Sequence, residues 1–409
     1  MAHDSPFSPD LGNESDSPLH PETLAVHAGT NRSPFGETSE AVFLTQGFVY
    51  KDMESAEARF KGTDEGGYIY SRFGNPTVTM FEDRMAALEG AEAARATATG
   101  MAAVAGVLLG YLKAGDHVIS SRVLFGSCNY ILAELLPKFG IETTFIDGTD
   151  PENWRTALRP NTRLFFLESP ANPTTELIDI PATAAIAREA GALLVVDNAL
   201  GTPLIQNPLR LGADVVTYSA TKHIDGQGRC LGGLIIGTAE FIETHIKNYL
   251  RHTGPALSPF NAWVLLKGLE TLPLRIEKQA RNAMALATAL SGTPGIARVR
   301  YPGLPDNPQA EIARRQMKTG GTVLALELDG GKEAAFRFGK ALQIVKISNN
   351  FGDAKSLVTH PATTTHERFK PEERAILGIG DGMLRLSAGL EHEADLVGDV
   401  LNAVRAAVQ

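Results

Sequence analysis

The chain has 409 residues, 43% apolar and 21% charged, which is typical of a soluble globular protein that can bury ample core without a metal or disulfide. Its 38 basic and 47 acidic residues give a net charge of −9 with no basic block, which argues against nucleic-acid binding. No apolar run approaches the roughly 20 residues of a membrane-spanning helix. The two cysteines, Cys128 and Cys230, lack zinc-ligand spacing, so no metal site is predicted, and free thiols suit a reducing cytoplasm.

The N-terminal part divides into two segments of different composition. Residues 1–20 are acidic and rich in Ser and Pro, which predicts a mobile tail. This segment has neither the basic start nor the apolar stretch of a signal peptide, so a cytoplasmic location is expected. Residues 21–75 contain several Gly and no sustained hydrophobic period. They are predicted to form an arm that needs another surface to order it.

The middle of the chain alternates between helical and strand patterns. Met101–Gly115 is apolar, Ala-rich and ends at a Gly, as a helix would, and Pro181–Gly191 is also helical in pattern. Runs that are apolar on both faces fit the strands of a parallel sheet. Five such runs are present, namely His117–Ser121, Arg163–Glu168, Ala192–Asp197, Asp214–Ser219 and Gly232–Gly237. The alternation predicts an α/β fold with a parallel sheet covered by helices.

After about residue 260 the alternation of helical and strand patterns ends. A long helical stretch over Asn261–Ser291 is predicted to lead into a second, smaller α+β domain. Strands are expected there at residues 322–329 and 383–388, and helices at residues 332–342 and 393–408. The predicted organisation is a tail (1–20), an arm (21–75), a large α/β domain (76–265) and a C-terminal domain (266–409).

Residues with useful chemistry follow the predicted strands or open a helix. In open α/β sheets, ligands bind outside the carboxyl ends of the strands. Acidic residues, one lysine, small hydroxyl residues and a Gly-opened helix therefore gather at one edge of the sheet. The residues concerned are Gly100, Glu168, Asn172, Asp197, Ser219, Thr221 and Lys222.

This combination matches the requirements of pyridoxal 5'-phosphate (PLP). A buried carboxylate such as Asp197 keeps the pyridine nitrogen protonated, because an adjacent anion raises the pKa of that nitrogen. The amine of Lys222 can form a Schiff base with the cofactor's aldehyde. The phosphate needs backbone N–H groups and hydroxyls, which the chain offers at Gly100, Met101, Ser219 and Thr221. The large domain is thus predicted to bind PLP and to act on an amino acid.

Each of these features alone has a plainer interpretation. A strand that ends in Asp is common, and a Lys in a polar loop is usually solvated at the surface. Openings such as TATGM also occur often by chance. The joint order of all the elements, each after a strand end or before a helix, favours the cofactor site. Nucleotide binding has less support, because the chain has no GxxxxGK[ST] sequence and no GxGxxG after a strand.

At SATKHIDGQGR (Ser219–Arg229) the sequence resembles the Cys/Met-metabolism family of PLP enzymes. The resemblance runs from about residue 23 to the C-terminus and includes YSRFGNPT, TGMAA, ESPANP, VDNA, SATKH, THPATTTH and LRLSAGLE. It implies the aspartate-aminotransferase-like fold (fold type I), with a mostly parallel central sheet and a smaller C-terminal domain. It also implies a homotetramer built from dimers with shared active sites.

The resemblance also implies roles for single residues. Lys222 would be the catalytic Schiff-base lysine and Asp197 the partner of the ring nitrogen, with Asn172 near the ring hydroxyl. The phosphate would be held by Gly100, Met101, Ser219 and Thr221, and across the dimer by Tyr70 and Arg72 of a neighbouring copy. A planar bidentate donor is expected for the substrate α-carboxylate, and the residues that match are Arg385, helped by Ser348.

One residue departs from the family pattern. Where many members have a Tyr before Gly in the loop that stacks on the ring, this chain has Phe125, which cannot donate or accept a proton. The resemblance implies a γ-replacement on an amino-acid ester, with the succinyl ester of homoserine and sulfide giving homocysteine as the favoured reaction. The acetyl ester, cysteine as the nucleophile and elimination from methionine stay open. A catalytically silent PLP-binding module is the alternative outside the enzymes.

Overall fold

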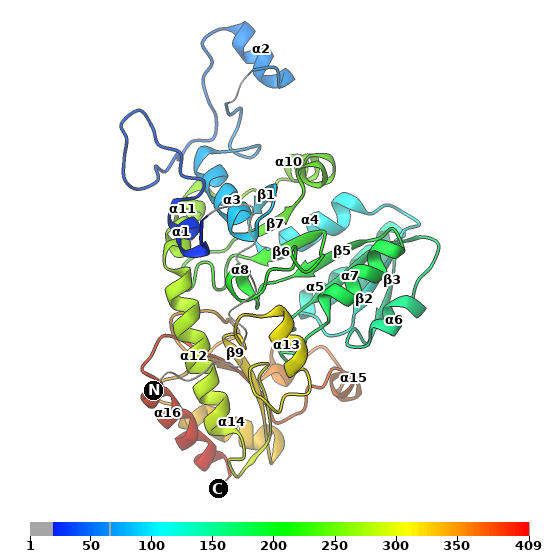
Figure 1. Cartoon of the computed structure of the whole chain (residues 1–409), viewed down its shortest axis with the longest axis vertical. Helices are drawn as coiled ribbons and strands as arrows, with labels where there is room; N and C mark the ends of the chain where they lie inside the picture. Colours follow the sequence, from blue (N-terminus) through cyan, green and yellow to red (C-terminus); the bar gives the residue numbers. More distant parts are fainter. Residues whose placement is uncertain (1–18, 65–66, 409) are drawn as a thin grey trace.

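The computed structural model describes residues 19–64 and 67–408. It combines a seven-stranded sheet covered by helices, a five-stranded sheet and an N-terminal arm (Figure 1). The tail predicted over residues 1–20 lies outside the described residues except at its last two positions. Across the described ranges, no helix is both long enough and apolar enough to cross a membrane.

The large sheet is mixed but mostly parallel, with the strand order β1-β7-β6-β5-β4-β2-β3. The five adjacent strands β6, β5, β4, β2 and β3 run parallel to one another. β7 runs antiparallel to both β6 and β1. The strands are β1 (Ala93–Thr97), β2 (His117–Ser121), β3 (Glu142–Ile146), β4 (Thr162–Glu168), β5 (Leu193–Asp197), β6 (Val215–Ser219) and β7 (Gly233–Gly237).

Two details of this sheet differ from the sequence prediction. The run over Gly232–Gly237 is predicted as a parallel strand, but β7 is antiparallel. Its five residues are all buried, and burial on both faces selects apolar residues whatever the direction of the strand. The edge strands β1 and β3 are not predicted at all. Their sequences, AARAT and ETTFI, lack the continuous apolar run of a central strand.

Helices cover both faces of the large sheet. Phe165 and Phe166 are neighbours in β4, and their side chains point to opposite faces because strand residues alternate. Phe166 packs into the core formed with α4, and Phe165 into the core formed with α7. The helical segments in this part are α3 (Pro76–Glu89), α4 (Gly100–Tyr111), α5 (Gly126–Tyr130), η1 (Ile131–Leu135), η2 (Leu136–Phe139), α6 (Pro151–Thr156), α7 (Ile180–Glu189), α8 (Thr202–Ile205), α9 (Ala239–Phe241), η3 (Ile242–Ile246) and α10 (Lys247–Thr253).

The second sheet has the order β10-β11-β12-β9-β8 and is antiparallel except for the pair of β10 and β11. Apolar residues of α12, α14 and α16 pack on it to form a core of its own. Its strands are β8 (Ile296–Arg300), β9 (Val323–Leu328), β10 (Lys346–Ile347), β11 (Leu357–Thr359) and β12 (Met383–Ser387). The helical segments around it are α13 (Ala310–Gln316), α14 (Gly331–Ala341), η4 (Pro361–Thr363), α15 (Pro371–Ile376) and α16 (Glu393–Ala407).

Two helices connect the sheets, where the sequence predicts a single helical stretch. α11 (Pro259–Glu270) ends before Thr271, and α12 (Leu272–Leu290) begins after it. Pro273 explains the break, because proline has no N–H to donate and is tolerated only in the first turn of a helix. The start of α12 contributes to the core under the large sheet, and its end contributes to the core of the second sheet. Figure 1 shows this helix running between the two parts.

The arm contains α1 (Pro21–His27) and α2 (Met53–Lys61). Figure 1 shows α1 against α3 and α11, whereas α2 projects far from the rest of the chain. Between them, the buried carboxylate of Glu40 forms ion pairs with Arg84 and Lys267. Beyond this anchor, Val49 is 99% exposed and Met53 is 86% exposed. The outer arm therefore carries apolar side chains that nothing else in the described chain covers.

Candidate active site

The carboxyl ends of β4, β5 and β6 meet at one edge of the large sheet, as the strand order predicts. Glu168 lies opposite Asp197 in the register of β4 and β5, and Asp197 lies opposite Thr217 of β6. A cavity of about 210 Å³ opens at this edge. Eight residues predicted from the sequence line it, namely Gly100, Met101, Phe125, Asn172, Asp197, Ser219, Thr221 and Lys222.

One end of this cavity is formed by the first turn of α4. Thr99 caps the helix, with its hydroxyl accepting a hydrogen bond from the Ala102 N–H at 3.1 Å. A Cβ added at Gly100 would lie 2.7 Å from Cβ of Ser219, so only glycine lets the helix approach β6 this closely. The first N–H groups of a helix have no partner within it. The close approach therefore brings these free donors next to the Ser219 hydroxyl.

The loop after β6 carries Thr221 and Lys222. The Thr221 hydroxyl accepts a hydrogen bond from the Gly232 N–H at 3.1 Å, which ties the loop to the start of β7. Nζ of Lys222 donates to Oδ1 of Asn350 at 2.6 Å. Burial, helped by the charge of Arg385, lowers the pKa of Lys222 to about 8, against the opposing effect of Asp197. About a tenth of this amine is thus neutral at pH 7, well above the fraction for an ordinary lysine.

A buried carboxyl group, Glu168, and a half-buried one, Asp197, stand side by side at the strand ends. Burial raises the pKa of both Asp197 and Glu168, and the neighbouring Asp197 charge raises that of Glu168 further. Oδ1 of Asp197 accepts a hydrogen bond from the Ala199 N–H at 3.0 Å. The two oxygens of Glu168 accept from the N–H groups of Phe125 and Asn172 at 2.8 and 3.0 Å. Glu168 thereby holds together the loops that carry two other site residues.

Arg385 lies in β12, behind the wall of the cavity. Its Nη1 donates to Oδ1 of Asn172 at 2.7 Å, and its Nη2 donates to the carbonyls of Asn349 and Asn350 at 2.8 and 2.9 Å. Burial lowers the pKa of this guanidinium to about 10. Within the described residues, its buried Nε has no hydrogen-bond partner. The side chain is held firmly and still has a donor to give.

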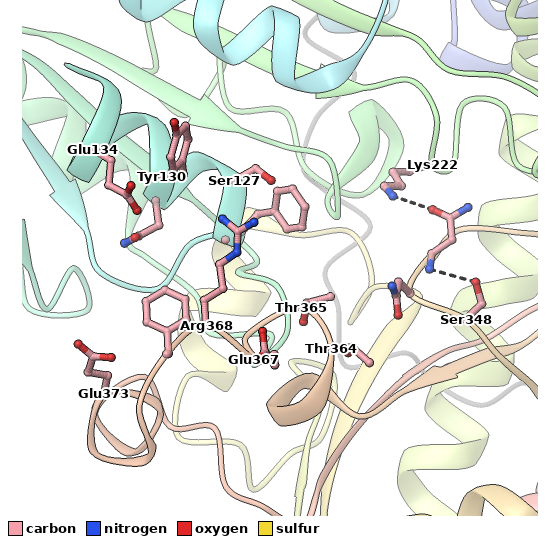
Figure 2. Close-up of a pocket in the computed structure, with 16 residues that line it drawn as sticks. Ser127, Tyr130, Glu134, Lys222, Ser348, Thr364, Thr365, Glu367, Arg368 and Glu373 are labelled. Carbon is pink, nitrogen blue, oxygen red and sulfur yellow. Dashed lines mark hydrogen bonds between the residues drawn. The ribbon is translucent and has the colours of Figure 1, made fainter. Parts of the chain in front are cut away.

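A larger cavity of about 1240 Å³ adjoins the first one, and the two share Phe125, Lys222 and Asn349 as lining residues. Figure 2 shows Lys222 at one side of this space, with Ser348 and the loop that contains Asn350 close by. The Asn350 N–H donates to Oγ of Ser348 at 3.3 Å. Lys222 therefore faces both a small enclosed space and a wide one that could admit a substrate.

Tyr70 and Arg72 are not brought to Lys222 within this chain. They line a separate cavity of about 480 Å³ near the root of the arm. The Arg72 guanidinium donates to the carbonyl of Arg251 and lies 4.7 Å from the ring centre of Phe73. Tyr70 is 38% exposed.

The sequence-based site gives no role to several residues that the structure places there. Glu168 is expected from the sequence at this edge, and it occupies the same position at the end of β4 as Asp197 does at the end of β5. Asn349, Asn350 and Phe351 line the cavities from a loop between β10 and β11. This loop reaches Lys222 only through the long-range packing of the two sheets, and no local sequence pattern predicts that contact.

The residues around the small cavity fit PLP. Asp197 offers a buried carboxylate to a protonated ring nitrogen, and the cation would relieve the cost of ionising that group. The first turn of α4 and Ser219 offer donors to a phosphate. Lys222 offers an amine that lines the same space. The fold and this cavity together define a PLP-dependent enzyme of fold type I.

The chain belongs to the family described as Cys/Met metabolism PLP-dependent enzymes, which matches residues 22–405. An O-succinylhomoserine sulfhydrylase of Mycobacterium tuberculosis is 50% identical over 386 residues, covering 93% of this chain and 95% of its own. One of Pseudomonas aeruginosa is 49% identical over 385 residues, covering 94% of this chain and 95% of its own.

A solved structure agrees with the family assignment. It is described as a putative O-acetylhomoserine (thiol)-lyase of Campylobacter jejuni with N'-pyridoxyl-lysine-5'-monophosphate. It has a TM-score of 0.91 and 32% identity, covering 95% of this chain and all of its own (100%). The predicted fold class, the family resemblance and the PLP cofactor are thereby confirmed.

Proposed function

We propose that the chain catalyses a γ-replacement in methionine biosynthesis, converting O-succinyl-L-homoserine and sulfide into L-homocysteine and succinate. The observation that carries the proposal is the half-buried amine of Lys222, which lines both the cavity that contains Asp197 and the adjoining wide cavity. The succinyl ester is favoured because the two O-succinylhomoserine sulfhydrylases are 50% and 49% identical to this chain.

Residues of the small cavity would hold the cofactor. Lys222 would bind its aldehyde, Asp197 would face its ring nitrogen, and Phe125 would cover its ring. Asn172 would lie beside the ring hydroxyl, and the phosphate would be held by Gly100, Met101, Ser219 and Thr221. When bound, PLP withdraws electrons from the substrate carbons and so makes their protons acidic.

Lys222 is the group we assign to proton transfer. Its amine would take the proton from Cα of the substrate and pass it on, which frees the amine to take a proton from Cβ, after which the γ-substituent leaves as succinate. Sulfide, as HS⁻, then forms the new bond at the same γ-carbon. The protons return to Cβ and Cα as these steps reverse, which gives homocysteine. A pKa near 8 suits a general base that works close to neutral pH. Phe125 has no hydroxyl, so Lys222 or water must also serve where relatives have a tyrosine.

Arg385 would bind the α-carboxylate of the substrate, with help from Ser348. Its bonds to Asn172, Asn349 and Asn350 fix the guanidinium before any ligand arrives. The unpaired Nε supports this role, since a carboxylate could accept from it. Holding the α-carboxylate orients Cα toward the amine of Lys222.

The proposal includes a homotetramer, in the cytoplasm, with active sites shared between paired copies. Tyr70 and Arg72 would reach the phosphate of the neighbouring copy from the root of the arm. The exposed apolar side chains of the outer arm support this arrangement, because a second copy would cover them.

Product analysis tests the proposed reaction. PLP-loaded protein is given O-succinylhomoserine or O-acetylhomoserine, each with sulfide, with cysteine or with no nucleophile. Homocysteine formed chiefly from the succinyl ester and sulfide is the expected result. Equal or greater use of the acetyl ester would favour the activity named for the Campylobacter jejuni protein. Cystathionine would indicate cysteine as the nucleophile, and oxobutyrate without added thiol would indicate elimination. The absence of any product would favour a catalytically silent PLP-binding module.

A further inference from the structure

The wide cavity has one cation besides Lys222 among its lining residues, and that cation is Arg368. Lys222 is engaged with Asn350. Arg368, by contrast, forms no ion pair and no side-chain hydrogen bond with any residue in the described part of the chain. A guanidinium that lines a substrate-sized space without a partner is available to an anion.

The backbone around Arg368 is held in place. His366 is buried, and its ring stacks on Phe369 with 5.6 Å between the ring centres. The Phe369 N–H donates to the His366 carbonyl at 3.2 Å, which closes a turn that contains Arg368. In Figure 2 the arginine side chain extends from this turn toward the helix that carries Ser127. The turn is thus fixed by its neighbours, and the exposed Arg368 side chain that it carries lines the wide cavity.

Acidic residues also line the wide cavity, but none of them neutralises Arg368. Glu134, Glu367 and Glu373 are exposed, and no ion pair joins any of them to the arginine within the described ranges. Glu373 is already engaged, because its Oε2 accepts from the Lys370 N–H at 2.7 Å. Figure 2 shows Glu367 and Glu373 on the side of the arginine stem, away from its guanidinium.

We infer that Arg368 binds the distal carboxylate of the succinyl group and thereby sets the preference for the succinyl over the acetyl ester. This inference rests on the proposed function. O-Succinylhomoserine carries two carboxylates, and Arg385 can bind only one of them. The second needs a cation at a distance from the α-carboxylate, beyond Lys222, and Arg368 is the lining residue that supplies one. The acetyl ester has no second carboxylate and gains nothing from this contact.

Steady-state kinetics of an Arg368→Ala variant test the inference. The KM for O-succinylhomoserine should rise roughly tenfold, as for the loss of a charge-assisted hydrogen bond, while the KM for O-acetylhomoserine stays within about twofold. The kcat for both esters should change little. Arg368→Lys should recover part of the loss. Lys370→Ala is the matched control, because that exposed lysine is close in sequence and does not line the cavity.

A binding measurement separates this inference from the proposed function. Calorimetric titration of both esters into a Lys222→Ala background, with and without Arg368→Ala, reports affinity without turnover. Selective weakening of the succinyl ester supports the inference even if no homocysteine is ever formed. If wild-type protein makes homocysteine but Arg368→Ala weakens both esters equally, or neither, the inference is wrong while the proposed function stands.

Discussion

Lys222 and Asn350 are 128 positions apart in the sequence, yet Nζ of the lysine donates a hydrogen bond to Oδ1 of the asparagine at 2.6 Å. Lys222 follows β6 of the large sheet, and Asn350 lies in the loop between β10 and β11 of the second sheet. The amine on which the proposed chemistry depends therefore sits where the two sheets meet. The pKa of this amine is lowered by Arg385 of the second sheet and raised by Asp197 of the large sheet.

Replacing Asn350 by Ala should lower the pKa of Lys222 below its value of about 8, because the side-chain oxygen that favours the charged amine is lost. Only the neutral amine attacks an aldehyde, so attachment of PLP to apoprotein should speed up as pH rises through about 8 in the wild type. The midpoint should move down by up to about one unit in the variant. Stopped-flow absorbance against pH measures it, and Asn349→Ala should leave the midpoint in place.

The Lys222→Ala variant should lose the covalent link to PLP and roughly a thousandfold or more in kcat, as for removal of a general base. Absorbance of the bound cofactor and the mass of borohydride-reduced protein report the link. Lys355→Ala, an exposed lysine that pairs with Asp353, serves as the control. A Lys222→Ala protein with normal turnover would falsify the assignment.

Asp197→Asn should keep the covalent link but lose roughly a hundredfold or more in kcat, because a neutral amide no longer holds the ring nitrogen in its cationic form. Exchange of the substrate Cα proton with deuterium isolates this step. Asp214→Asn changes a carboxyl group before the start of β6 and should retain the exchange. Equal exchange in both variants would mean that Asp197 does not face the ring.

Arg72→Ala and Lys222→Ala proteins should each be nearly inactive alone and should recover activity when they are mixed and allowed to exchange copies. One of the two sites in a mixed dimer then has both residues intact, so the mixture should reach roughly a quarter of wild-type activity. Activity assays after mild dissociation and reassembly measure the recovery. No recovery, with exchange demonstrated by mass spectrometry, would place Arg72 outside a shared site.

Glu89 makes a separate prediction about stability. This buried carboxyl accepts from the Tyr218 hydroxyl, and burial raises its pKa from 4.5 to about 7. The folded-state pKa of Glu89 is higher than the unfolded one. The protonated carboxyl therefore stabilises the folded chain below pH 4.5, and this stabilisation is lost as pH rises through 7. The free energy of unfolding of Glu89→Gln, taken relative to that of the wild type, should therefore be roughly 3 kcal/mol higher at pH 8.5 than at pH 4.5. Urea unfolding at the two pH values measures this, with exposed Glu311→Gln as the control.

Sequence reasoning succeeded where chemistry follows local structure. The sequence predicts Asp197 and Lys222 at one sheet edge because each lies at or shortly after the carboxyl end of a strand, and both line the same cavity. Asn350 and Arg368 could not be predicted in this way. They come from loops of the second sheet, which meet the large sheet only through packing between distant parts of the chain. The roles of the site residues and the boundaries near residues 76 and 266 stay predictions.

The helix α12 belongs to two cores at once, and this gives the chain an unusual sensitivity to length changes. Leu272 and Ile276 at its start pack under the large sheet, whereas Leu286 and Leu290 at its end pack on the second sheet. Deleting one residue in the middle of α12 would rotate everything after it by about 100° and shift it by about 1.5 Å. Loops elsewhere can absorb such a deletion. Here it would swing Asn350, Arg368 and Arg385 away from Lys222, although the two sheets that carry these residues could each still fold.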